Sequence, residues 1–88
     1  MHELSLMKDL LHKIEQIALE NQPLQLQSVT VVLGALSHIS AQHFREHFQQ
    51  AVAGSELESV ALEVEFDADI HSPTAQDILL KSVDLTEP

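Results

Sequence analysis

Apolar and polar positions recur along the chain with two different periods, and the changes of period predict where helices and strands lie. Over residues 4–19 apolar side chains recur every three or four positions, which is typical of an amphipathic helix. Pro23 should end this helix, because proline lacks a backbone donor and restricts the residue before it. A second helix is predicted at about 41–53, with Ser40 as its N-cap and Gly54 just past its end.

Three other segments, residues 26–37, 59–69 and 78–86, have the period of two that predicts β-strands. Gly34 near the end of the first segment indicates a bulge or a close backbone approach. In the second segment the inward-facing residues are expected to be Val60, Leu62, Val64 and Phe66. In the third segment the apolar positions change face: either a bulge near Lys81-Ser82 restores them to one face, or both faces of the strand are partly covered.

The elements together predict a small α+β domain in the order helix-strand-helix-strand-strand. We expect two helices packed on one face of a three-stranded sheet. The last two strands, which follow one another across a loop at about 67–77, are expected to pair antiparallel. With 88 residues, residues 1–88 should form a single domain.

Charge and composition narrow the partners and the chemistry. The formal charge of −10 disfavours binding to nucleic acid or to an anionic membrane. Cysteine is absent, which excludes disulfides and thiolate metal sites.

No apolar run approaches the ~20 residues that span a bilayer, and the start does not resemble a secretory signal, so a cytoplasmic protein is expected. Nucleophile–base pairs and phosphate-binding loops are not recognisable, and the chain is not expected to be an enzyme.

The opening tripeptide Met1-His2-Glu3 carries candidate metal chemistry. A free α-amine has a reference pKa of about 7.7–8, so near neutral pH it can serve as a nitrogen ligand. The imidazole of His2 and the neighbouring amide nitrogens lie within chelate reach, and planar nitrogen coordination is typical of Ni(II) or Cu(II). In the alternative interpretation, His2 is simply solvated and Glu3 interacts with the positive end of the helix dipole.

The order of several short segments resembles the HypA family of nickel metallochaperones. These segments are MHELSL at the start, then VTVVLGALS, FREHF and LEVEF, and LLKSVDL near the end. The resemblance implies that nickel is bound at the N-terminus through Met1, His2 and Glu3. It also implies delivery of nickel to a hydrogenase large subunit, beside a HypB-like GTPase.

The chain departs from the family pattern in the loop at about 67–77 and at two positions nearer the start. The family carries a zinc domain with two Cys-x-x-Cys pairs, and here a short cysteine-free loop at about 67–77 stands in its place. We therefore expect nickel but no zinc. Family members often have Glu where this chain has Ala35, and often an acid where it has Ser40.

Other polar residues have weaker functional interpretations. His43 and His47 are spaced i, i+4 on the second helix, close enough for metal ligation, although two solvated histidines would have the same spacing. His38 lies in the turn before that helix, where it could supply an axial ligand or be an ordinary turn residue. The acidic row Glu63, Glu65 and Asp67 is either a solvated strand face or a docking surface for a basic partner.

The sequence thus predicts a nickel-binding accessory protein in the maturation of nickel–iron hydrogenase. The alternative is a metal-free adaptor with the same fold that binds a maturation partner or target protein. The oligomeric state is left open, and a homodimer is compatible with the sequence.

Overall fold

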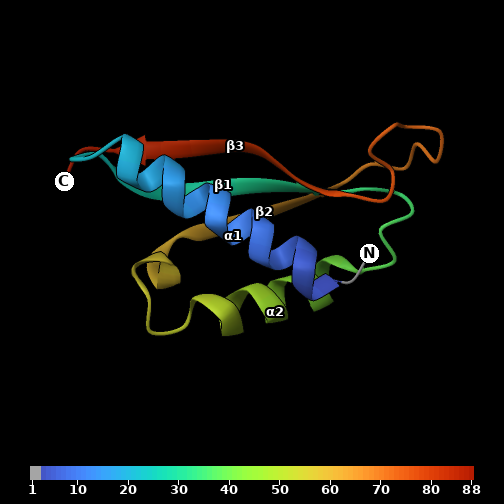
Figure 1. Cartoon of the computed structure of the whole chain (residues 1–88), viewed down its shortest axis with the longest axis horizontal. Coiled ribbons are helices and arrows are strands. Elements are labelled where there is room, and N and C mark those ends of the chain that lie inside the picture. The colour runs from blue at the N-terminus through green and yellow to red at the C-terminus, as the bar shows by residue number, and fades with distance from the viewer. Residues whose placement is uncertain (1–2) are drawn as a thin grey trace.

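The computed structural model describes the backbone of residues 3–88 and the side chains from residue 5 onward. The elements are α1 (Glu3–Glu20), β1 (Gln25–Leu33), α2 (Ala41–Val52), the short 3-10 helix η1 (Glu56–Ser59), β2 (Ala61–Phe66) and β3 (Ile78–Thr86). Figure 1 shows both α-helices on the same side of the sheet. This confirms the predicted α+β class and element order, to which the structure adds η1. Within the described residues, no helix is long and apolar enough to cross a membrane.

The strand order in the sheet is β2-β1-β3, so that β1 is the central strand. Strand β1 pairs parallel with β2 and antiparallel with β3. The expected antiparallel pairing of β2 with β3 is therefore wrong. Helix α2 connects β1 to β2 as a crossover, the connection that parallel neighbours need. Strand β2, with Glu63 and Glu65, suits an edge position, where charged side chains oppose pairing with other chains.

Strand β3 contains a bulge near Lys81-Ser82, which was one of the two alternatives left open by the sequence. Thr30 of β1 pairs with Ser82 and Val31 pairs with Leu80, which leaves Lys81 as the extra residue. The bulge allows Leu80 and Val83, which would otherwise point to opposite faces, both to pack against the core.

The core lies between the helices and one face of the sheet. It contains Met7, Leu10 and Ile14 of α1, Val29, Val31 and Leu33 of β1, and Phe44, Phe48 and Val52 of α2. The expected inward positions Val60, Leu62 and Val64 are partly buried against it. Phe66 is not part of this core: it is the last residue of β2 and is 63% exposed.

Gly34 makes the close backbone approach that the sequence indicated. The N–H of Gly34 donates a hydrogen bond to the carbonyl oxygen of Asp77 at 3.0 Å. The N–H of Leu36 donates to the carbonyl oxygen of Ala75 at 2.7 Å. A Cβ atom at Gly34 would lie 2.2 Å from the carbonyl oxygen of Ala75. Only glycine fits here, and the contact holds the residues after β1 against the residues before β3.

We expect replacement of Gly34 by Asn to lower the free energy of unfolding by about 1–3 kcal/mol, because a backbone neighbour cannot move aside as a side chain can. Gly54→Asn is the matched control. Gly54 has φ 79° and open space around its Cα, and Asn tolerates this left-handed conformation. Urea denaturation of both variants checks the prediction, which equal stabilities would contradict.

Candidate functional site

The predicted nickel ligands lie at or before the start of α1. Met1 and His2 are outside the described residues, and Glu3 is described only as the first backbone residue of α1. Their use as ligands therefore stays a prediction. The structure does describe what surrounds the first turns of the helix.

A hollow lies beside the start of α1, where three segments of the chain meet. Its lining consists of Leu6 from α1, Leu36, Ser37, His38 and Ile39 from the turn before α2, and Gln76 and Ile78 from the start of β3. The backbone contacts at Gly34 hold the turn before α2 against the chain that leads into β3. His38 has the left-handed φ of 61°, a conformation that non-glycine residues rarely adopt and that is found at turns and functional sites. The structure thus places His38 in the same hollow as the first turns of α1.

Ser37 adds an unusual polar atom to this hollow. Its Oγ is buried and has no hydrogen-bond partner among the described residues. Buried polar atoms in folded proteins are generally paired. Sequence reasoning missed this residue, because nothing in the pattern distinguishes Ser37 from an ordinary turn serine.

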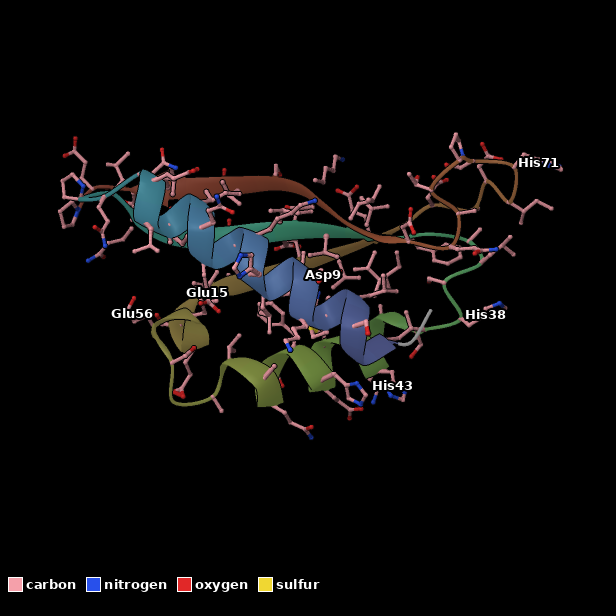
Figure 2. The ribbon with its side chains drawn as sticks, viewed as in Figure 1. Asp9, Glu15, His38, His43, Glu56 and His71 are labelled. Atoms are coloured by element: carbon pink, nitrogen blue, oxygen red, sulfur yellow. The ribbon has the colours of Figure 1, made fainter. Side chains whose placement is uncertain are left out.

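Helix α2 brings His43 and His47 together. Ser40 caps the helix, its Oγ accepting a hydrogen bond from the N–H of His43 at 3.1 Å, which confirms the N-cap prediction. The Nε2 atoms of His43 and His47 are 3.1 Å apart. Figure 2 shows His43 on the surface of the helix. The i, i+4 spacing was the signal for this proximity in the sequence.

The remaining histidines are dispersed. His12 lies on the exposed side of α1, and Figure 2 shows His71 at the far end of the loop between β2 and β3, away from His43. That loop is ordered by its own side chains: Asp67 Oδ1 accepts from the N–H of Asp69, and Asp69 Oδ1 accepts from the N–H of His71. Among the side chains that the structure describes, from residue 5 onward, no three His, Asp or Glu residues come close enough to form a metal cage.

The acidic residues Glu63 and Glu65 lie on the sheet face opposite the helices, paired in register with Thr30 and Val32. Glu65 forms a salt bridge of 2.8 Å with Lys81, and both side chains are about half exposed. Such an exposed pair contributes at most about 1 kcal/mol to stability. This face is therefore a solvated, net acidic surface.

The arrangement of elements matches that of a solved structure over its whole length. The solution structure of the Ni metallochaperone HypA from Helicobacter pylori superimposes with a TM-score of 0.78 at 18% identity, and the match covers all of both chains. At this identity the similarity establishes the fold.

Sequence comparison identifies the family. A family model described as the hydrogenase/urease nickel incorporation metallochaperone HypA matches residues 1–71. The hydrogenase maturation factor HypA of Nitrosospira multiformis is 35% identical over 65 residues, which cover 74% of this chain and 56% of that protein. The chain belongs to the HypA family, which is a family of metallochaperones and not of enzymes. It spans a little over half the length of that relative.

The Ser40 cap should control how well the first turn of α2 is formed. We expect Ser40→Ala to lower the free energy of unfolding by about 1 kcal/mol, because the N–H of His43 loses its acceptor. Ser40→Asp should keep the stability, since a carboxylate oxygen also caps a helix and interacts favourably with its dipole. Thermal unfolding followed by circular dichroism tests this, and equal losses in both variants would rule out the cap.

Proposed function

We propose that this chain is a nickel-binding accessory protein that acts in the maturation of nickel–iron hydrogenase. The family match, which includes Met1, His2 and Glu3 among the residues 1–71 that it covers, is the observation that carries the proposal. The names of the matched proteins, a Ni metallochaperone and a hydrogenase maturation factor, support the same function.

In the proposed site, nickel is cargo held by the α-amine of Met1, the imidazole of His2 and the adjacent main-chain nitrogens. Helix α1 begins at Glu3, and the first N–H groups of a helix have no intrahelical acceptor. An amide nitrogen at this position can therefore lose its proton without breaking a helical hydrogen bond. The carboxylate of Glu3 would offset the unfavourable interaction of a cation with the positive end of the helix.

We further propose that residues 1–88 act as one HypA-like domain, in which the loop at about 67–77 stands in place of the zinc module of the family. The loop joins two strands that do not pair with each other and is held by its own hydrogen bonds. Because the chain has no cysteine, it should be isolated without tightly bound zinc.

The partners we propose follow from the resemblance to the family: a HypB-like GTPase and a hydrogenase large subunit. The alternative function, a metal-free adaptor, keeps these partners and dispenses with nickel. The solvated acidic face around Glu63 and Glu65 favours a basic docking partner in either case.

The terminal nickel site can be tested on three chains that begin at Met1: the unmodified chain, the N-acetylated chain and the His2→Ala variant. We expect acetylation and His2→Ala each to weaken Ni(II) binding by roughly 100-fold or more, because each removes one arm of the chelate. Nickel binding should also weaken as the pH falls through the range in which an α-amine and an imidazole take up protons.

Cu(II) should bind the unmodified chain at least as tightly as Ni(II), since affinity rises from Ni(II) to Cu(II) for most sets of nitrogen ligands. Calorimetric titration measures all three effects.

His71→Ala is the matched control, since it removes a histidine from a remote loop and should leave nickel binding unchanged. Equal nickel affinity in the unmodified, acetylated and His2→Ala chains would exclude the terminal site, and no nickel binding in any of them would favour the metal-free adaptor. The fold should be the same in all of them by far-UV circular dichroism.

Association with a partner should depend strongly on salt. With a charge of −10, the chain should attract a basic surface at long range, and salt shortens that reach to about 8 Å at 0.15 M. We expect the association rate constant with the GTPase or the large subunit to fall about tenfold or more between low salt and about 0.5 M salt. Stopped-flow measurement tests this, and a rate that does not change with salt would count against the acidic docking surface.

A further inference from the structure

We propose that His43 and His47 form a second metal-binding site, in which two imidazoles chelate a divalent transition-metal ion such as Cu²⁺ or Ni²⁺ on the surface of α2. This site uses only side chains from the part of the chain that the structure describes. It does not depend on the proposed nickel site.

The distance between the two imidazoles fits a chelate. The Nε2 atoms are 3.1 Å apart. Two metal–nitrogen bonds of about 2.0–2.1 Å that span this distance enclose an angle of roughly 100°. That angle lies between the ~90° of planar or octahedral coordination and the ~109° of tetrahedral coordination, so the usual geometries of Cu²⁺, Ni²⁺ and Zn²⁺ are all accessible.

The orientation of the rings differs from that of a straight hydrogen bond between them. In a straight N–H···N hydrogen bond, each ring would lie directly behind its nitrogen, and the centroids would be about 5.4 Å apart. Around a shared metal ion the centroids would be about 4.8 Å apart. The observed separation is 4.4 Å, with the ring planes at 75° to each other. The ring axes are therefore bent away from the line between the two nitrogens, and a small rotation of the side chains would bring the centroids to the chelate distance.

The helix that carries the pair is firmly held. Phe44 and Phe48, each directly after one of the histidines, are 0% and 2% exposed in the core. Arg45 Nη1 donates to the carbonyl oxygen of Leu62 at 2.7 Å and so ties α2 to β2. Because the backbone positions are fixed, binding one ion by both imidazoles costs only side-chain entropy and no backbone entropy.

The chemistry of binding is simple. Each imidazole ligates through Nε2 when it is neutral and carries its proton on Nδ1. The two histidines supply two ligands, and water or a group from another molecule completes the coordination. An ion held in this way keeps open positions and exchanges readily. The net charge of −10 raises the concentration of cations near the surface.

The test uses the full chain with an acetylated N-terminus and the His2→Ala substitution, so that the terminal chelate is removed. This chain should bind Cu²⁺, and His43→Gln or His47→Gln should weaken the binding by roughly 10- to 100-fold, because one arm of the chelate is lost. A register control carries His47→Gln together with Gln49→His. It keeps the number of histidines and the helix, but it places the two imidazoles on different sides of α2 and should bind as weakly as His47→Gln.

Calorimetry gives the affinities, and paramagnetic broadening of backbone amide signals by Cu²⁺ locates the ion. We expect broadening centred on α2 in the parent chain and in its His71→Gln control, both of which should bind equally tightly. Circular dichroism confirms that each variant is folded. The proposal is overturned if the register control binds as tightly as the parent, if His71→Gln weakens binding as much as His43→Gln, or if broadening is centred outside α2.

Discussion

The central position of β1 is the constraint on which the rest of the structure depends. This strand forms backbone hydrogen bonds on both sides, with β2 in parallel and with β3 in the opposite direction. A parallel neighbour requires a crossover, and α2 supplies it. The crossover brings Phe44 and Phe48 over the same sheet face that buries Val29, Val31 and Leu33. The direction of β2 thus determines on which side of the sheet α2 lies and which of its side chains face water.

The end of β1 positions the candidate functional region. Because Gly34 touches the backbone of Ala75, the chain leaving β1 and the chain entering β3 are held together. The turn that contains His38 then lines a hollow with Leu6 of α1. A side chain at Gly34 would separate these segments. Gly34 therefore determines where the turn with His38 lies relative to the first turns of α1. A substitution there would affect function only indirectly, by moving that turn.

Much of this arrangement could be predicted from the sequence, and what could not has physical reasons. Helical periodicity, the Ser40 cap and the bulge at Lys81 are local features, recorded in the spacing of side chains. The pairing of β2 with β1 is not local, since alternation within β2 identifies a strand but not its neighbour. The exposure of Phe66 was also missed, because the pattern predicts which face of the strand a residue occupies but not how far other elements cover that face. The proximity of His43 and His47 followed from their spacing, whereas the orientation of their rings required the structure.

The position of the candidate metal ligands relative to the core suits a protein that must release its ion. Where a structural metal supplies folding free energy, binding and folding are coupled, and losing the ion means losing the fold. Here the core is built from aliphatic and phenylalanine side chains across α1, β1 and α2. His43 and His47 project from α2 on its exposed side, one residue away from side chains that anchor the helix. The helix is therefore stabilised by the packing of Phe44 and Phe48 and not by its histidines, so an ion bound at the proposed site would be taken up or passed on without disturbing the core that keeps the domain folded.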